Sequence, residues 1–222
     1  MNRASTCAHY RGESGARYFD WQREIGALGG LLNLYKFAPY VRDDAAVCDF
    51  GCGGGFLLAR LPGRQKVGVE VNPDARRAAT ERGLWTVESA SELPDAHFDV
   101  IVSNHALEHT RRPLDELGVL RGKLKVGGLL ICCVPVDDWR NERAYDRTDI
   151  NHHLYTWTPQ LLGNLATEAG YTVRSVRVLR YAWSPRLWRA FRWNRWLFDL
   201  ACRVNAVMLR RYQVLLVAMR AT

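Results

Sequence analysis

The sequence predicts an α/β fold in which a doubly wound, mostly parallel sheet carries helices on both faces. Between residues 45 and 134, short apolar runs with β-branched residues alternate with stretches of helical spacing. That alternation is typical of parallel strands joined by right-handed crossovers. A glycine-rich turn follows the first apolar run, at the end of a strand where such sheets bind ligands. The length of 222 residues fits a single domain spanning 1–222.

Six runs are predicted strands because each is short and either continuously apolar or alternating. Four belong to the alternating region: AAVCDF (45–50), QKVGVEV (65–71), FDVIVS (98–103) and LLICCVP (129–135). Two follow it: YTVRSVRVL (171–179) and YQVLLVAMR (212–220).

The predicted helices lie between these strands, at 56–61, 73–83, 113–124 and 158–170. Pro73, Pro113 and Pro159 suit the first turn of a helix, where a missing N–H costs nothing. Thr158 is the expected N-cap of the last helix, and Gly170 is its expected end. The apolar, aromatic segment 18–41 precedes the first strand; glycines interrupt it, so it forms one or two helices lying over the edge of the sheet.

The sharpest local signal is VCDFGCGGGF, residues 47–56. A buried strand ends in Asp49, and Gly51, Gly53 and Gly55 follow it. Glycine at these positions allows a tight turn and a close approach of a ligand to the backbone. The helix expected from residue 56 would add free N–H groups for an anionic ligand group.

An acid completes this pattern. Glu70 ends the next strand, 19 residues after Gly51, which is the position of an acid that binds a ribose diol. The dinucleotide fingerprint GxGxxG fails here because its third glycine would fall at Phe56. Asp49 inside the turn would repel a pyrophosphate but suits a ligand that carries an ammonium and a sulfonium.

The ordered segments VCDFGCGGG, GVEVNP, ESASELP, FDVIVSNHALEH and LKVGGLLICCVP resemble the motifs of class I S-adenosylmethionine-dependent methyltransferases. The resemblance covers about residues 18–179 and the last strand. It implies a Rossmann-like, seven-stranded sheet whose last strand is antiparallel, and S-adenosyl-L-methionine as cofactor. The runs at 171–179 and 212–220 would supply the antiparallel pair.

The resemblance also implies cofactor-binding roles for matching positions. The methionine part of the cofactor would contact Asp49, Gly51, Cys52, Gly53 and Gly55. Glu70 would bind the ribose hydroxyls, and Val71, Ser89 and Ala90 would contact the adenine. Asn104 would face the methyl group. The family usually has an acid where this chain has Ser89. Cys52 is either a reactive thiol or, as we expect, a small filler of the loop.

Together these observations divide the domain into four segments. Residues 1–44 form an N-terminal helical cap, and 45–180 form the cofactor-binding core. An Arg- and Trp-rich helical insert at 181–211 separates two strands that a short hairpin normally joins, and 212–220 form the final strand.

A histidine cluster follows the fourth predicted strand, in SNHALEHT at 103–110. Methyl transfer gains much from alignment alone, and a general base helps when the acceptor is a hydroxyl. We take His109 as the catalytic base and His105 as the second choice; the alternative is that His109 only caps or packs. Their spacing also resembles a metal site, but the segment shows no third ligand, so we expect no metal.

A second polar and aromatic cluster is DINHHLYTWTP, residues 149–159. It resembles the HLY-x-x-TP segment that walls the acceptor pocket in small-molecule members of the family. His152, His153 and Tyr155 are therefore the expected substrate contacts. The alternative is a loop whose aromatic residues fill the edge of the core.

The insert combines four tryptophans (Trp183, Trp188, Trp193 and Trp196) with regularly spaced arginines. On one continuous helix, Arg186, Arg189, Arg192, Arg195 and Arg203 would share half of the wheel, opposite Leu187, Phe191, Phe198 and Ala201. Such a face is typical of a helix in a membrane interface, here residues 183–210. Nucleic acid is a less favoured partner. A helical lid or a contact between two copies in a homodimer is the structural alternative.

Charge supports an anionic partner for the C-terminal region. Residues 1–170 hold 20 Lys and Arg against 22 Asp and Glu, whereas 171–222 hold 11 Arg and one acid, Asp199. The chain has no apolar window long enough to span a bilayer and no apolar core typical of a signal peptide, so we expect a cytoplasmic protein, in peripheral contact with the inner membrane face. The six cysteines form no CxxC pair, so we expect neither disulfides nor zinc.

The resulting hypothesis is transfer of a methyl group from S-adenosylmethionine to a small or lipid-linked acceptor, preferably a hydroxyl of a sugar, glycan precursor or lipid. An RNA methyltransferase is the alternative enzyme, weakened because the first 170 residues are not basic. A cofactor-binding scaffold without catalysis, acting at a membrane, is the alternative outside enzymes.

Overall fold

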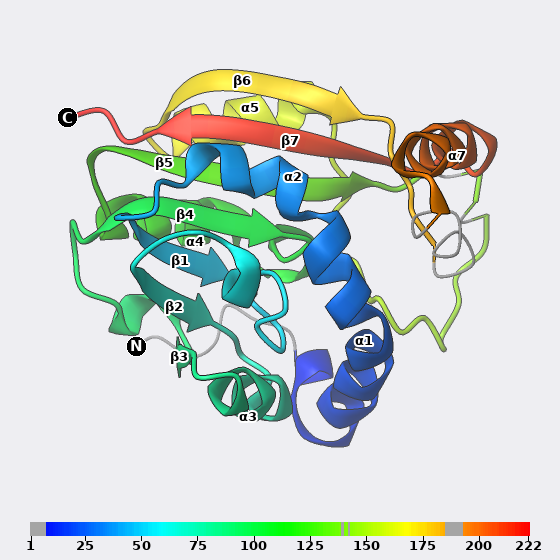
Figure 1. Ribbon diagram of the computed structural model, residues 1–222, viewed down its shortest axis with the longest axis horizontal. Helices are drawn as coiled ribbons and strands as arrows, with labels where there is room; N and C mark the ends of the chain where they lie inside the picture. Colours follow the sequence, from blue (N-terminus) through cyan, green and yellow to red (C-terminus); the bar gives the residue numbers. More distant parts are fainter. Residues whose placement is uncertain (1–7, 139, 142, 185–192) are drawn as a thin grey trace.

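The fold is built on one seven-stranded sheet with the strand order β3-β2-β1-β4-β5-β7-β6. The computed structural model describes residues 8–138, 140–141, 143–184 and 193–222 (Figure 1). The strands are β1 (Ala46–Phe50), β2 (Gln65–Val69), β3 (Trp85–Val87), β4 (Phe98–Asn104), β5 (Leu124–Val136), β6 (Thr172–Leu179) and β7 (Tyr212–Met219). Only β7 runs antiparallel to its neighbours, β5 and β6, so the predicted Rossmann-like sheet is confirmed.

The helices cover both faces of this sheet, with α4 and α5 behind it and α2 in front of it in Figure 1. They are α1 (Gly12–Leu32), α2 (Leu34–Phe37), α3 (Pro73–Glu81), α4 (Pro113–Lys123), α5 (Pro159–Glu168) and α7 (Arg195–Met208). Single 3-10 turns are η1 (Ala8–Tyr10), η2 (Ala38–Tyr40), η3 (Leu58–Arg60), η4 (Ala90–Glu92) and η5 (Leu107–His109). The hydroxyl of Thr158 accepts from Leu161 N at 3.1 Å, so the predicted N-cap of α5 is confirmed.

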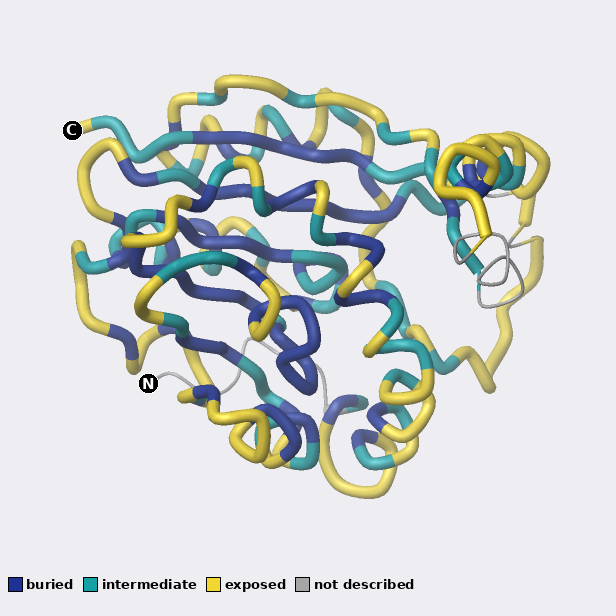
Figure 2. The backbone as a smooth tube through the Cα atoms, viewed as in Figure 1, coloured by how far each residue is buried: buried dark blue, intermediate teal, exposed yellow. Residues whose placement is uncertain are grey.

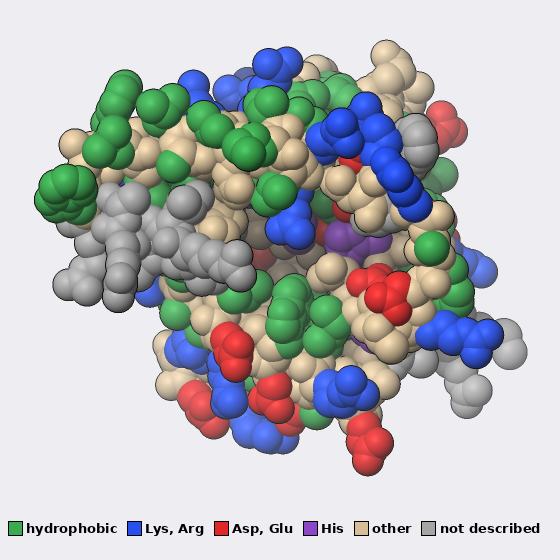
Figure 3. Space-filling view, turned by 90° about the vertical axis from the view of Figure 1, so that its right-hand side faces the viewer, with side chains coloured by type: hydrophobic (Ala, Val, Ile, Leu, Met, Phe, Trp, Pro, Cys, Tyr) green, Lys and Arg blue, Asp and Glu red, His purple; other side chains and the backbone are tan. Residues whose placement is uncertain are grey.

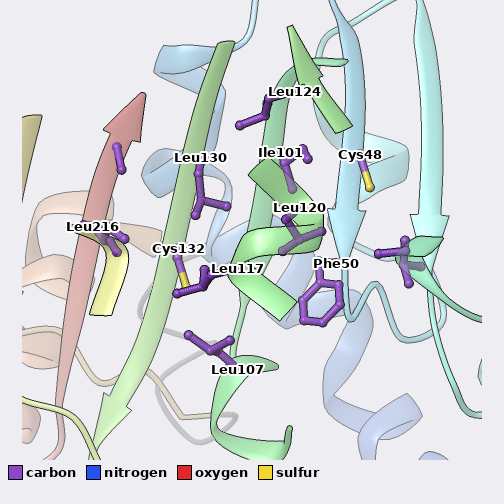
Figure 4. Close-up of a cluster of buried hydrophobic side chains, with 14 of the residues drawn as sticks. Cys48, Phe50, Ile101, Leu107, Leu117, Leu120, Leu124, Leu130, Cys132 and Leu216 are labelled. Atoms are coloured by element: carbon purple, nitrogen blue, oxygen red, sulfur yellow. The ribbon is translucent and has the colours of Figure 1, made fainter. Parts of the chain in front are cut away.

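Two hydrophobic clusters lie on opposite faces of the sheet because successive strand residues point to opposite sides. Ile101 and Cys132 face α4, where Leu117 and Leu120 are buried against them (Figure 4). The neighbouring strand residues belong to the second cluster, which includes Phe37 of α2. The central strands are therefore buried along their length (Figure 2).

One predicted helix is wrong. Residues 56–61 form only the turn η3 rather than a helix. Pro62 follows directly, and a proline disfavours helical backbone in the residue before it. β2 begins at Gln65, so no room is left for further turns. The short strand β3 was not predicted from the pattern, since it has three residues and Trp85 is 54% exposed.

The N-terminal segment forms two helices, α1 and α2, and glycines do not break α1. A side chain at Gly26 would overlap the ring of Phe56, and one at Gly30 would overlap the backbone carbonyl of Phe56. The glycines therefore let α1 lie directly on the loop that follows β1. This contact places α1 across the carboxyl ends of the strands (Figure 1).

The insert between β6 and β7 differs from its prediction. Asn194 is extended, with φ −151° and ψ 114°, and its side chain accepts from Trp196 N and Leu197 N as the N-cap of α7. One continuous helix from Arg186 to Arg203 is therefore wrong, and so is the wheel drawn on it. Arg186, Leu187, Trp188, Arg189, Phe191 and Arg192 lie outside the described residues.

Candidate active site

The site lies where the carboxyl ends of β1, β2 and β4 meet. In Figure 1 their arrowheads point to the side that carries α1 and α7. Figure 3 looks onto this side: histidine side chains lie inside a hollow, and apolar side chains cover the upper left of the same face.

The glycine turn after β1 has the backbone that the sequence predicts. Gly51, Gly53 and Gly55 have φ of +76°, +52° and +75°, which favours glycine. A side chain at Gly51 would also overlap Ala106, and one at Gly55 would overlap Leu84. The loop is therefore held close to the strand β4 side of the site.

The N–H groups of this turn are used within the protein. Gly51 N and Cys52 N both donate to the carbonyl of Val69, at 2.8 and 3.1 Å, and Gly53 N donates to the Glu70 carboxylate. Because no helix begins at Phe56, the expected anion site at a helix N-terminus is also wrong. Because these three N–H groups already have acceptors, the turn offers a ligand a closely approaching backbone and carboxylate groups.

Glu70 lies directly after β2 and caps the glycine turn. One carboxylate oxygen accepts from Gly53 N and the other from Asn72 N, both at 2.8 Å. Burial raises the pKa of Glu70, and these two N–H groups act against that rise. The carboxylate is thus fixed beside the turn, in a position suited to a pair of ribose hydroxyls.

Asp49 is the second carboxylate of the cleft. It is the last residue but one of β1 and is 2% exposed, and its carboxylate accepts no hydrogen bond from the described residues. Burial, and then the charge of Glu70, raises the pKa of Asp49 to about 7. A ligand with positive charge would relieve both effects, so the pair fits the ammonium and sulfonium of S-adenosylmethionine.

Helix α1 covers this cleft. A side chain at Gly53 would press on the amide of Gln22. Burial raises the pKa of Tyr18, and the charges of Glu70 and Glu108 add to that rise. Tyr18 therefore lies near both carboxylates, and its ring centroid is 6.4 Å from that of His109. Neither contact was predictable from the sequence, because α1 reaches the cleft only through the fold.

The other predicted cofactor residues differ in how far they are buried. Val71 is half-buried after β2, and Ser89 is exposed and caps η4 by accepting from Ser91 N. Ala90 is 1% exposed and packs in the core. Cys52 is buried, which raises the pKa of its thiol and agrees with the role of a filler.

A buried polar network lies at the end of β4. The ammonium of Lys36 donates to Asn104 Oδ1 at 3.2 Å and to the side-chain oxygen of Gln213. Cys133 Sγ donates to the same oxygen at 3.2 Å. Lys36 is 1% exposed, and burial lowers its pKa. This network fixes the side chain of Asn104, the residue expected to face the methyl group.

The two candidate bases flank one buried carboxylate. His105 Nδ1 lies 3.3 Å from Glu108 Oε1, and His109 Nε2 lies 4.0 Å from the same atom. The side chain of Glu108 has no exposed surface. The pKa of His105 is raised to about 9 by its contacts with Cys133 and Glu108, which outweigh burial. Burial lowers the pKa of His109 to about 4.

The three predicted substrate residues separate in space. His153 lies beside His109, with 5.0 Å between ring centroids. The ring of His152 stacks instead on His9 at 4.6 Å. Tyr155 donates to the carbonyl of Arg111 at 3.1 Å and lies outside the cluster. Only His153 therefore joins the predicted bases.

Two partners of this cluster were missed at the sequence level. The hydroxyl of Tyr10 lies 2.6 Å from His109 Nδ1. His153 Nδ1 lies 2.8 Å from the carboxylate of Asp137. Tyr10 and Asp137 come from segments far from His109 in the chain, and no local motif marks them.

Comparison with known families and proteins shows which family the chain belongs to. Residues 24–176 match a family model described as a methyltransferase domain. The ubiquinone biosynthesis O-methyltransferase of Roseobacter denitrificans is 34% identical over 127 residues, which cover 51% of this chain and 50% of that protein. An uncharacterised methyltransferase of Mycobacterium tuberculosis is 41% identical over 93 residues, which cover 38% and 47%. The chain spans about half the length of these curated relatives.

A solved structure shares the fold along nearly the whole chain. The S-adenosylmethionine-dependent methyltransferase of Archaeoglobus fulgidus superposes with a TM-score of 0.65 at 20% identity, over 91% of this chain and 99% of that one. The family match covers well over half of this chain, and the sheet order and glycine turn agree with it. The chain therefore belongs to the class I S-adenosylmethionine-dependent methyltransferases, whose cofactor is S-adenosylmethionine.

Proposed function

We propose that this protein transfers a methyl group from S-adenosylmethionine to a hydroxyl oxygen of a small or lipid-linked acceptor. The observation that carries the proposal is that a cofactor cleft and a histidine cluster lie next to each other. A cleft with the buried carboxylate of Asp49 and the half-buried carboxylate of Glu70 lies beside the histidine pair His109 and His153. The curated relative named above as an O-methyltransferase supports oxygen as the acceptor atom.

When bound, the cofactor supplies an electrophilic methyl group on a sulfonium. Asp49 would hold its positive part, and Glu70 would bind the ribose hydroxyls. Lys36 fixes the amide of Asn104 next to the reacting centre. Such alignment is worth about 7–11 kcal/mol in favourable cases, so positioning is the main task of these residues.

His109 is the group that acts on the acceptor hydroxyl in this proposal. Its lowered pKa keeps the imidazole neutral at neutral pH, with a lone pair on one ring nitrogen. The pKa of about 9 keeps His105 protonated at the same pH, so His105 has no lone pair to accept a proton. In this proposal its role is to hold Glu108.

Replacing His109 is expected to slow the methyl-transfer step without weakening the binding of the cofactor. His109→Ala should lower turnover by about 10²–10⁴-fold while the Kd for S-adenosylmethionine stays within twofold. The checks are methyl-transfer assays and isothermal titration calorimetry. The matched control is His97→Ala, since His97 bonds Gln65 at the other end of β4. Full turnover in His109→Ala would remove this residue from the chemistry.

The proposal extends to acceptors that reside in a membrane. Helix α7 buries Phe198, while Trp196, Leu200 and Val204 are 68%, 45% and 49% exposed. Figure 2 shows most of the circumference of α7 exposed. The exposed Arg203, Arg210 and Arg211 flank this apolar face and suit anionic lipid. None of the helices in the described part of the chain is long and apolar enough to cross a membrane.

Membrane contact is testable at α7. The combined change Trp196→Ser, Leu200→Ser and Val204→Ser should reduce co-sedimentation with vesicles rich in phosphatidylglycerol by at least tenfold. The reason is loss of the apolar area that enters the interface, worth about 25 cal/mol per Å². Trp85→Ser removes an exposed tryptophan elsewhere and should leave sedimentation unchanged. Equal binding by all variants would contradict the contact.

A further inference from the structure

Three candidate ligand atoms lie close together in the histidine cluster around His109. The carboxylate of Glu108 and one ring nitrogen each from His109 and His153 lie within 4.8 Å of one another. Glu108 and His109 belong to η5, and His153 comes from the loop before α5. The premise that no third ligand is near the histidines is therefore wrong; the ligand is supplied 44 residues after His109.

The carboxylate of Glu108 is an unexplained buried group. It has no exposed surface, and neither of its oxygens accepts a hydrogen bond from the described part of the chain. Nearby positive charge comes from His105 on one side only. His105 therefore compensates this buried carboxylate from one side, and a cation bound between Glu108, His109 and His153 would compensate it from the other.

Each histidine ring is oriented by a hydrogen-bond partner at its Nδ1 atom. Tyr10 donates its hydroxyl hydrogen to the carbonyl of Asn151 at 2.5 Å, so His109 Nδ1 is the donor in its contact with Tyr10. Asp137 only accepts, so His153 Nδ1 carries the hydrogen in that pair. Both Nε2 atoms are then left with a lone pair. Metal-binding histidines are oriented in the same way by carboxylates and other acceptors.

We propose that Glu108, His109 and His153 form a site for a divalent transition-metal ion. Two imidazoles and one carboxylate are a donor set that suits zinc, iron and cobalt. Ligand atoms around a tetrahedral zinc ion lie about 3.3 Å apart. Side-chain rotations that move the three atoms by about 1 Å would bring them to this spacing. Three protein ligands leave coordination positions open toward the hollow.

The site would act on the acceptor, so this inference rests on the proposed function. An acceptor hydroxyl bound at an open position has a lowered pKa and gives its proton to solvent. Its oxygen then forms a bond to the methyl carbon as the carbon–sulfur bond breaks, and the bonding pair stays on sulfur. The lone pair of His109 holds the ion in this case, rather than taking the proton itself.

Metal binding is tested without any acceptor. Protein treated with a chelator is titrated with Zn²⁺ by calorimetry and with Co²⁺ by visible absorption. We expect one ion per chain, and loss of at least 100-fold in affinity in both His153→Ala and Glu108→Gln. Tyr10→Phe should weaken binding by about 10–100-fold because it frees His109 to rotate. His97→Ala is the matched control and should bind as the unchanged protein does.

The outcomes separate this site from the methyl transfer. Equal affinity in His153→Ala, or no bound ion in the unchanged protein, would overturn the metal site. If the chelator-treated protein keeps full methyl transfer, the ion has no role in it and the proposed function stands. If zinc binds as expected but no hydroxyl acceptor is methylated, the proposed function fails and the site remains. Restored transfer on adding Zn²⁺ would support both.

Discussion

Asp49→Asn is expected to stabilise the free protein and to abolish most of its cofactor binding. The pKa of Asp49 is raised from an ordinary 3.8 to about 7, so the folded state resists its ionisation. Because the unfolded chain ionises at lower pH, stability falls as pH rises from about 4 to about 7. Three pKa units correspond to about 4 kcal/mol at pH 8, and Asn removes that cost.

The same variant should bind S-adenosylmethionine about 100-fold more weakly, because it lacks the charge that faces the ammonium. In the unchanged protein, the Kd should fall about tenfold per pH unit up to pH 7 and then level off. In Asp49→Asn, the Kd should not depend on pH in this range. Thermal unfolding and calorimetry from pH 5 to 8 give both quantities. A lower Tm at pH 8, or unchanged affinity, would contradict the role of Asp49.

Glu70→Ala is expected to raise the Kd for S-adenosylmethionine by at least 100-fold. The change removes a carboxylate placed to accept from two ribose hydroxyls, each bond to a charged group being worth about 1.5–3 kcal/mol. It also leaves Gly53 N and Asn72 N without their acceptor. The turn therefore loses its order as well as its contact.

Glu70→Gln separates these two losses. The amide keeps one oxygen for the turn but carries no charge, so its Kd should lie between those of the alanine variant and the unchanged protein. Glu81→Ala, at the exposed end of α3, is the matched control. Equal affinity in Glu70→Ala and the control would remove Glu70 from the cofactor site.

The sheet was predictable because its strands are buried on both faces and so appear as apolar runs. β3 escaped prediction because Trp85 is exposed and only three residues pair. The helix expected at 56–61 failed for a reason visible in the sequence, since Pro62 stops it. The insert failed because a helical wheel assumes continuity, and Asn194 begins a new helix.

The sequence pattern brought the candidate cofactor residues together because Asp49 and the glycines lie at the end of β1 and Glu70 follows the adjacent β2. The histidine cluster was predictable only in part. Its members come from three segments, and Tyr10 and His109 are 99 positions apart. Glu108 lies between the two histidines in the sequence, but only the fold shows that its side chain is fully buried. The same holds for Lys36, which reaches Asn104 from α2.

The central claim is methyl transfer from S-adenosylmethionine to a hydroxyl acceptor through this cleft. Its most direct test uses methyl-tritiated S-adenosylmethionine and extracts of the source cell, with Glu70→Ala as the inactive control. We predict label in the organic-extractable or glycan fraction with the unchanged protein, and none with Glu70→Ala. Label found in RNA, or none in any fraction despite measurable cofactor binding, would contradict the claim.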